Sequence, residues 1–368
     1  MDRGQRRIAG VDALRGLAIF FVLMNHVNIR LLMNKVPYTK SIPPPILQAL
    51  VWNGQYGVQM FFAVSGFLIT SMTLRRWGGL SQVKPRYFYP LRFARIAPLL
   101  LLLLLVLSAL HFLRANLFVV TAARGGLENA LFAALTFHVN VLEAHRGYLP
   151  PNWDILWSLS VEEVFYLVFP LACIGLGRGK WFIALLGALV VSGPFARTLL
   201  AYNEVWKEYS YLGAMDAIAL GCLTAIFLNR RPLTPGTLPF LQALGVSLMI
   251  FVLGFSDLAR RIGLQRAGLD MSVLALGTCM VIAAAAQNQR AGLIALSPLR
   301  WLGQRSYEVY LTHMFVVIVL LNIFIAAGKP ITGVPAFFAG AVIFSALLGE
   351  IVARLYSEPM NRFLRERI

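Results

Sequence analysis

Long runs of apolar residues dominate this chain, and short polar loops rich in Arg, Gly and Pro separate them. A helix needs about 20 mostly apolar residues to cross the hydrocarbon core of a bilayer. Ten runs have about this length, and they cover 10–30, 55–74, 96–113, 158–176, 181–201, 210–228, 238–255, 270–287, 306–327 and 334–355. The pattern predicts an all-α fold, a polytopic membrane helical bundle with about ten transmembrane helices. The gaps are too short for a second folded domain, so we expect a single membrane domain over 1–368.

An eleventh apolar segment, 127–142, does not fit this series. It reads LENALFAALTFHVNVL, which is short for a crossing and carries Glu128, His138 and Asn140. Ionisable side chains are costly inside hydrocarbon. We therefore expect this segment to be re-entrant, or to lie at the outer face of the membrane, rather than to cross it.

The composition supports a membrane protein. Hydrophobic residues make up 58% of the chain and charged residues 13%, and the mean hydropathy is +0.71. Globular domains carry about 25% charged residues, so a soluble protein is excluded, as are a disordered and a collagen-like chain. The 33 Lys and Arg residues outnumber the 16 Asp and Glu residues, for a net charge of +17. On so apolar a chain, this excess indicates the positive-inside bias of membrane proteins rather than a nucleic-acid partner.

The basic residues can be sorted by the side of the membrane on which they fall. With ten crossings, 19 lie on the side of the N-terminus and 11 on the other side, while Arg15, Arg197 and Arg354 fall inside the spans. This bias predicts a multi-pass plasma (inner) membrane protein with both termini in the cytoplasm. An eleventh crossing at 127–142 would move the later basic clusters outside, which disfavours it. The first apolar run is too long for a secretory signal peptide.

The first span carries two ionisable side chains, which are candidates for function wherever they lie within a membrane. Arg15 and His26 are 11 residues apart, close to three helical turns, so both project from one face. They are separated by roughly 16 Å along the helix axis. A neutral imidazole can accept a proton from a hydroxyl group. The alternative is that His26 only joins two helices through a polar contact.

Two more charged pairs lie in apolar surroundings. Glu162 and Glu163 are neighbours on a predicted helix, where they diverge by about 100°, so at most one can face a given site. A carboxylate beside His26 could orient its ring, and the alternative is an ion pair with an arginine at the membrane edge. Arg92 and Arg95 share a helix face and suit bidentate binding of phosphate. The alternative for these arginines is a role in setting the topology.

Weaker signals come from other polar residues within the spans. SYEVYLTHMFV carries Tyr307, Tyr310 and His313, and YLGAMDAIALG carries Asp216; either segment could form a polar contact between helices. The three cysteines lie in apolar runs without CxxC or Cys/His spacing, so neither a disulfide framework nor a metal site is predicted.

Taken in order, these segments resemble the acyltransferase-3 family of integral membrane O-acyltransferases. The resemblance rests on DALRGLAIFFVLMNH, FFAVSGFLIT, RFARIAP, LTFHVNV, WSLSVEEVFYLVFP, SYEVYLTH and YSEPMNR, which extend over nearly the whole chain. The family's Arg-x10-His pair matches Arg15 and His26, and its Arg-x-x-Arg matches Arg92 and Arg95. Its other two motifs match Trp157, Ser158, Leu159 and Glu162, and Phe61, Phe62, Ser65 and Gly66. The match favours Glu162 over its neighbour.

The resemblance implies transfer of an acyl group, usually acetyl from acetyl-CoA, to a hydroxyl of a carbohydrate, glycolipid or glycosylated metabolite. With the residue pattern, it supports the hypothesis that His26 acts as general base or acyl carrier, that Arg15 guides the donor or stabilises the active geometry, and that Glu162 orients His26 or balances its charge. No metal is implied. The residues expected to bind the acyl-CoA donor are Arg92, Arg95, Ser65, Gly66, Trp157, Ser158, Tyr310 and His313.

The chain departs from the family pattern in two places. Many members have an arginine two residues before the aspartate that matches Asp216, where this chain has Ala214. No SGNH domain follows the last span, so we expect every catalytic group to come from the membrane domain. A proton-coupled small-molecule transporter is the alternative function, because His, Arg and Glu also build proton relays. Against it, no inverted repeat is visible. A protein that keeps the fold but lacks catalysis is a third possibility.

Overall fold

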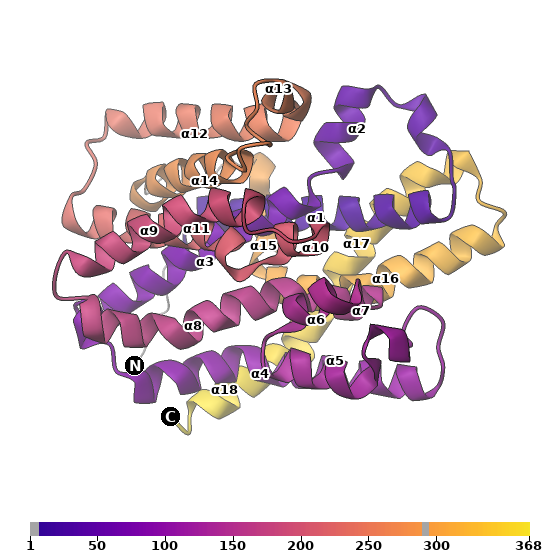
Figure 1. Cartoon of the computed structure of the whole chain (residues 1–368), viewed down its shortest axis with the longest axis horizontal. Helices are drawn as coiled ribbons and strands as arrows, with labels where there is room; N and C mark the ends of the chain where they lie inside the picture. The colour runs from indigo at the N-terminus through magenta and orange to yellow at the C-terminus, as the bar shows by residue number, and fades with distance from the viewer. Residues whose placement is uncertain (1–6, 289–293) are drawn as a thin grey trace.

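The computed structural model describes residues 7–288 and 294–368, so Arg3, Arg6 and Arg290 of the charge count lie outside the described residues. Within those ranges the chain forms helices, turns and loops, and no strand (Figure 1). The α-helices are α1 (Ala9–Met33), α2 (Pro44–Val51), α3 (Gly54–Trp77), α4 (Pro85–Phe112), α5 (Gly126–Leu135), α6 (Val139–Arg146), α7 (Pro151–Asp154), α8 (Leu156–Leu176), α9 (Trp181–Thr198), α10 (Glu204–Tyr209), α11 (Tyr211–Arg230), α12 (Thr237–Gly254), α13 (Ser256–Arg261), α14 (Asp270–Gln287), α15 (Ser297–Gln304), α16 (Ser306–Ala326), α17 (Val334–Val352) and α18 (Glu358–Arg365). The single helical turns are η1 (Tyr38–Ser41), η2 (Leu80–Gln82), η3 (Ala122–Arg124), η4 (Ile294–Leu296), η5 (Ile331–Gly333) and the π-helical η6 (Ala353–Ser357).

Ten helical segments of the described ranges are long and apolar enough to cross a membrane. The prediction of an all-α, multi-pass membrane bundle is therefore confirmed. Most of the long helices run along the horizontal axis of Figure 1, with α12 and α14 on one side of the bundle and α4 and α18 on the other. We call the end at which α1 begins the inner end and the opposite one the outer end. Because successive crossing helices alternate, α4 begins at the inner end, whereas α3, α8 and α14 begin at the outer end.

The segment 127–142 forms two short helices, α5 and α6, of ten and eight residues. Each is too short to cross the hydrocarbon core. The chain turns between them at Phe137, whose φ is 59°. The second helix of the pair packs against α8 and against α10, the short helix that precedes α11 at the outer end. The expectation that this segment does not cross the membrane is confirmed.

Helix α4 begins 11 residues before the apolar run that predicted it, at Pro85 rather than at 96. With 28 residues the helix is about 42 Å long, more than the roughly 30 Å of the hydrocarbon core. Its first turns therefore extend beyond the hydrocarbon and need no apolar sequence. This extension places Arg92 and Arg95 on the helix itself, close to its inner end.

The backbones of α3 and α11 touch each other, because glycines occupy the contact. A Cβ atom on Gly66 would lie 2.0 Å from the carbonyl oxygen of Ile218, and one on Gly221 would lie 2.0 Å from that of Ala63. Small residues at helix interfaces allow this close approach within a membrane. The packing fixes the position of α3 and, with it, Ser65 beside α8.

Candidate active site

Two histidines on different crossing helices face each other. The rings of His26 on α1 and His313 on α16 have centroids 5.0 Å apart and planes at 62°. His313 is fully buried, and its Nδ1 lies 2.6 Å from the carbonyl oxygen of Tyr310. A carbonyl oxygen only accepts hydrogen bonds, so Nδ1 carries the proton and Nε2 is an acceptor. Among the described residues, neither His313 Nε2 nor His26 Nδ1 has a hydrogen-bond partner. Each of these two nitrogens therefore keeps an unused hydrogen-bonding position.

One face of α8 carries three polar side chains, Ser158, Glu162 and Tyr166, at intervals of about one turn. Glu162 accepts hydrogen bonds from Ser65 Oγ at 2.6 Å and from Tyr166 Oη at 2.5 Å. The hydroxyls of Ser65 and Tyr166 also contact each other. At the outer end of this row, Ser158 Oγ lies 2.6 Å from Tyr310 Oη. The row therefore extends over about 12 Å and ends beside the histidine pair.

Arg92 and Arg95 lie at the inner end of this row. The guanidinium carbon of Arg92 is 3.5 Å from the centre of the Tyr166 ring, and its Nη2 is 3.8 Å from Glu163 Oε1. Arg95 lies over the ring of Tyr307, with its guanidinium carbon 5.9 Å from the ring centre. Both arginines are partly exposed, so each can still bind a further ligand.

The two adjacent glutamates of α8 have different partners, as expected for neighbours on a helix. Glu163 is buried and pairs with Arg92, whereas Glu162 joins Ser65. Within the described part of the chain, no hydrogen bond connects Glu162 to His26. The structure therefore gives Glu162 a different contact from the one expected from the sequence.

Arg15 and Arg30 flank His26 on α1. Arg15 interacts electrostatically with Glu162 and Arg95, which places it beside the inner part of the polar row. Arg30 follows His26 by one helical turn, and the two interact electrostatically. Arg15 therefore lies beside the inner part of the polar row, whereas His26 lies in the histidine pair at its outer end.

Two of the residues predicted to bind the donor pack against other parts of the protein. The Trp157 ring is buried and stacks on Tyr209, with centroids 4.1 Å apart and planes at 5°. Gly66 lies against α11, and its carbonyl oxygen accepts from Cys222 Sγ at 3.5 Å. Both residues shape the walls that hold the polar row.

Several polar groups near the histidine pair had no assigned role in the sequence. Asp154 interacts electrostatically with Arg30 and accepts a hydrogen bond from Tyr209 Oη at 3.2 Å. Burial raises the pKa of Glu143, on α6 outside the crossing helices, well above its ordinary value, and the neighbouring Asp154 raises it further. Tyr166 could have been found from the sequence, because it follows Glu162 by one helical turn. The contact between Glu143 and Asp154 depends on the packing of α6 against the start of α8, which no local pattern reveals.

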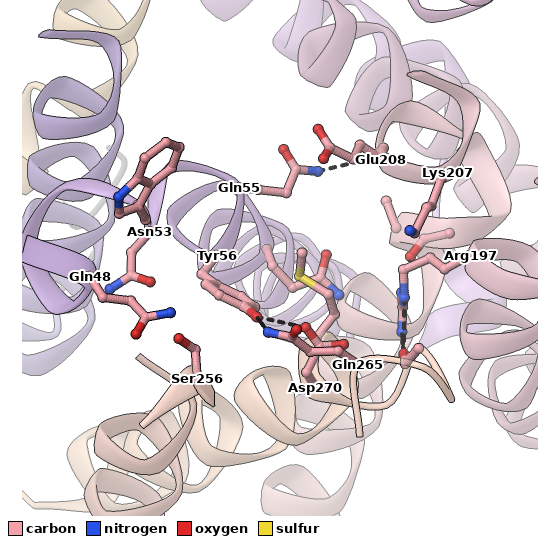
Figure 2. Close-up of a pocket in the computed structure, with 16 residues that line it drawn as sticks. Gln48, Asn53, Gln55, Tyr56, Arg197, Lys207, Glu208, Ser256, Gln265 and Asp270 are labelled. Carbon is pink, nitrogen blue, oxygen red and sulfur yellow. Dashed lines mark hydrogen bonds between the residues drawn. The ribbon is translucent and has the colours of Figure 1, made fainter. Parts of the chain in front are cut away.

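A cavity of about 380 Å³ opens among the outer ends of α3, α9, α11 and α14 (Figure 2). Its lining includes five amide side chains, those of Gln48, Asn53, Gln55, Gln59 and Gln265. None of its lining residues belongs to α1, α8 or α16. The cavity is therefore separate from the histidine pair.

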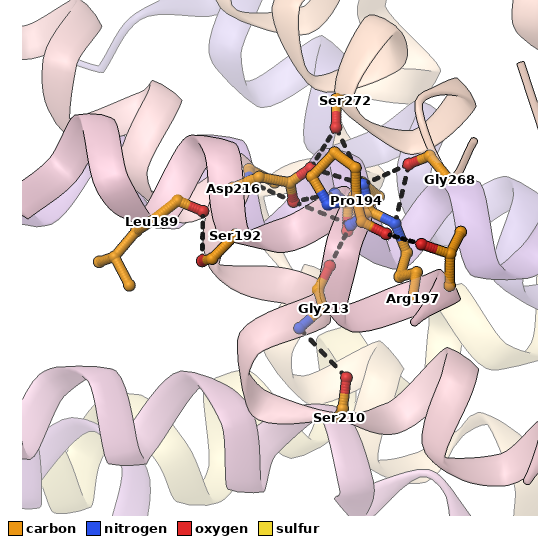
Figure 3. A network of polar contacts seen from close by, with 12 residues as sticks. Leu189, Ser192, Pro194, Arg197, Ser210, Gly213, Asp216, Gly268 and Ser272 are labelled. Atoms are coloured by element: carbon orange, nitrogen blue, oxygen red, sulfur yellow. Dashed lines mark hydrogen bonds and ion pairs between the residues drawn. The ribbon is translucent and has the colours of Figure 1, made fainter. Parts of the chain in front are cut away.

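Beside this cavity, Arg197 connects α9, α11 and α14 (Figure 3). Its guanidinium donates to both carboxylate oxygens of Asp216, at 3.1 and 2.7 Å, and to the carbonyl oxygens of Gly213 and Gly268. The sequence assigned no role to Arg197. Ala214 stands where the family resemblance leads us to expect an arginine near Asp216. Arg197, on the neighbouring helix α9, provides a guanidinium partner for Asp216 in this chain.

Comparison with known proteins gives the family. A family model described as an acyltransferase domain matches residues 8–350. The chain is 23% identical over 378 residues to the O-acetyltransferase OatA of Staphylococcus aureus strain NCTC 8325, covering 97% of this chain and 58% of that protein. It is 26% identical over 328 residues to the peptidoglycan O-acetyltransferase OatA of Listeria monocytogenes serovar 1/2a, covering 84% and 49%. It is 26% identical over 381 residues to the putative peptidoglycan O-acetyltransferase YrhL of Bacillus subtilis strain 168, covering 97% and 55%.

The chain thus spans about half the length of these relatives. No solved structure matches it. The family model nevertheless covers nearly all of the chain, including the segments that hold the histidine pair and the polar row of α8. The resemblance carried by the sequence motifs is confirmed, and the chain belongs to this acyltransferase family.

Proposed function

We propose that this chain transfers an acyl group, most simply acetyl, from acyl-CoA on the cytoplasmic side to a hydroxyl of a carbohydrate or glycoconjugate. The observation that supports it best is the polar row of α8, which connects Arg92 at the inner end to the histidine pair. A donor that binds at one end can thus meet a hydroxyl that approaches from the other. The names of the relatives favour acetyl as the acyl group and peptidoglycan as one carbohydrate to test.

The donor phosphates would bind to Arg92 and Arg95, whose guanidinium groups are partly exposed at the inner end of the row. Guanidinium groups suit phosphate because they donate two parallel hydrogen bonds. Arg15 would guide the pantetheine arm towards His26. The excess of basic residues on this side, 19 against 11, favours a cytoplasmic inner end. Both termini would then lie in the cytoplasm, and a single domain would span the plasma (inner) membrane.

His26 would act as the general base. Its unpartnered Nδ1 takes the proton of the incoming hydroxyl, and the hydroxyl oxygen attacks the thioester carbonyl carbon. The carbon–sulfur bond then breaks, and the leaving thiolate takes the proton from the imidazolium, so atoms and charge balance. His313 Nε2 would accept a hydrogen bond from a second hydroxyl of the same sugar and so position the sugar. An alternative route with the same residues makes His26 the acyl carrier.

Ser65 has a carboxylate neighbour, but we assign it a positioning role. The Glu162 carboxylate is shared between two hydroxyl donors, those of Ser65 and Tyr166, and is not dedicated to Ser65. Glu162 accepts the Ser65 hydrogen and so holds both side chains in place at 2.6 Å. The pair fixes the wall along which the acyl group would pass.

The test is acyl transfer by the purified full chain in lipid nanodiscs. With acetyl-CoA labelled on the acetyl group, the proposal predicts release of free CoA and a labelled carbohydrate. In liposomes, uptake of a small molecule driven by a proton gradient, with no CoA released, would instead support the transporter.

A further inference from the structure

The outer cavity presents hydrogen-bond acceptors to whatever enters it. Four of its five amides, those of Asn53, Gln55, Gln59 and Gln265, donate through the amide nitrogen to protein oxygens 2.7 to 3.4 Å away. The oxygens of these four amides accept no hydrogen bond from the described residues. Ser256 also belongs to the lining, and its Oγ has no hydrogen-bond partner among the described residues although the residue is only 4% exposed. Such a wall suits a ligand that carries several hydroxyl donors.

The cations around the cavity are paired within the protein, whereas two carboxylates of its lining, Asp270 and Glu208, have no ion pair among the described residues. Arg197 is neutralised by the bidentate contact with Asp216. Asp270 Oδ2 accepts the hydroxyl of Tyr56 at 2.6 Å. Lys207 is exposed and pairs with a neighbouring glutamate of its own helix at 3.3 Å. An anionic ligand is therefore disfavoured because it would face these carboxylates, and the acceptors of the lining suit a neutral ligand that donates hydroxyl hydrogens.

Aromatic side chains complete the lining. Trp52 is 50% exposed, so its ring offers a flat apolar surface to a ligand, and Tyr56 in the first turn of α3 also lines the cavity. Aromatic faces pack against the apolar side of a ring while polar groups bind its edges. The volume of about 380 Å³ lies within the range of roughly 300 to 1,000 Å³ that is usual for small-molecule sites.

We propose that this cavity is a second saccharide site, which binds a neutral sugar unit of the glycan while another unit of the same glycan reaches His26. The inference rests on the proposed function for the identity of the glycan. Binding itself is independent of catalysis, because no lining residue belongs to the helices of the histidine pair. The site would hold a polymeric substrate against the outer face and lower its KM.

Binding is tested with the full chain in nanodiscs by isothermal titration, with the neutral N-acetylated chitotetraose as the probe. We expect Trp52→Ala and Ser256→Leu each to weaken binding about tenfold, the change that follows from a loss of about 1.4 kcal/mol. Trp181→Ala is the matched control, because that tryptophan is 65% exposed but begins α9 at the inner end.

Equal affinity of these three variants, or no binding of the probe by the unchanged chain, would overturn the proposed site. A chain that binds the probe in this way but never transfers acetyl would overturn the proposed function alone. In transfer assays the Trp52→Ala variant should raise the KM for the tetrasaccharide and leave the KM for a monosaccharide unchanged. A structural defect would instead lower kcat for both substrates.

Discussion

Replacing Arg197 by methionine should destabilise the protein strongly, because Arg197 and Asp216 form an ion pair within the bundle. Their side chains are 8% and 0% exposed, respectively. Methionine keeps much of the arginine volume but leaves the carboxylate of Asp216 without its cation. The Arg197 hydrogen bonds to the Gly213 and Gly268 carbonyl oxygens would be lost as well.

Breaking a buried ion pair by removing one partner costs about 3 to 5 kcal/mol. An exposed pair contributes about 1 kcal/mol or less. Arg354→Met is the matched control, because Arg354 also lies in a crossing segment and pairs with a carboxylate, that of Glu350, but its side chain is 70% exposed. The double variant Arg197→Met/Asp216→Leu should be more stable than Arg197→Met alone, because it leaves no unpaired charge.

Equilibrium denaturant unfolding of the purified variants in detergent, followed by circular dichroism, measures these differences. We expect a loss of about 3 to 5 kcal/mol in the free energy of unfolding for Arg197→Met and at most about 1 kcal/mol for Arg354→Met. Equal losses for the two variants, or a loss below about 1 kcal/mol for Arg197→Met, would refute the reasoning.

Three further predictions concern single residues. Tyr166→Phe keeps the ring beneath Arg92 but removes the hydrogen bond to the Glu162 carboxylate. Such a bond contributes about 1.5 to 3 kcal/mol, so kcat for acyl transfer should fall about tenfold to a hundredfold. An unchanged kcat would contradict the role of the polar row. The pKa of Glu143 is raised in the folded state. The free energy of unfolding should therefore fall as pH rises from the ordinary pKa of a glutamate through the raised one, by up to about 1.4 kcal/mol per pH unit. The free energy of unfolding of Glu143→Gln, measured over the same pH range, should not show this fall. Gly66→Ala would place Cβ 2.0 Å from a backbone oxygen of α11, so it should lower the free energy of unfolding by about 1 to 3 kcal/mol. Gly187→Ala is the control and should cause no such loss, because the space around Gly187 is open. Similar losses in the two variants would exclude the close helix contact.

The crossing helices could be predicted because bilayer thickness imposes a local requirement on each segment. For 127–142, three polar residues in a short run were enough to exclude a crossing, and α5 and α6 bear this out. The start of α4 was predicted too late because its inner turns lie beyond the hydrocarbon. There a helix needs no apolar run, and its sequence resembles that of a loop.

The candidate site was predictable only as far as its residues share a helix. The spacing of Arg15 and His26 shows that they project from one face of α1. That His26 faces His313 depends on how α1 packs against α16, which no spacing within either helix determines. The contact of Arg197 with Asp216 joins different helices in the same way. Sequence motifs therefore supply the residues of such a site, and the packing of the helices decides which of them touch.

The proposed role of His26 is tested most directly by His26→Ala in nanodiscs, with acetyl-CoA labelled on the acetyl group and a carbohydrate substrate. We expect the transfer rate to fall by about a hundredfold or more, the usual contribution of a general base, while the amount of folded protein is unchanged. His145→Ala is the matched control and should transfer acetyl at the unchanged rate, because that histidine is exposed and stacks on Tyr202 away from the pair. If the His26→Ala variant transferred acetyl as fast as the control, His26 would be neither the base nor the acyl carrier.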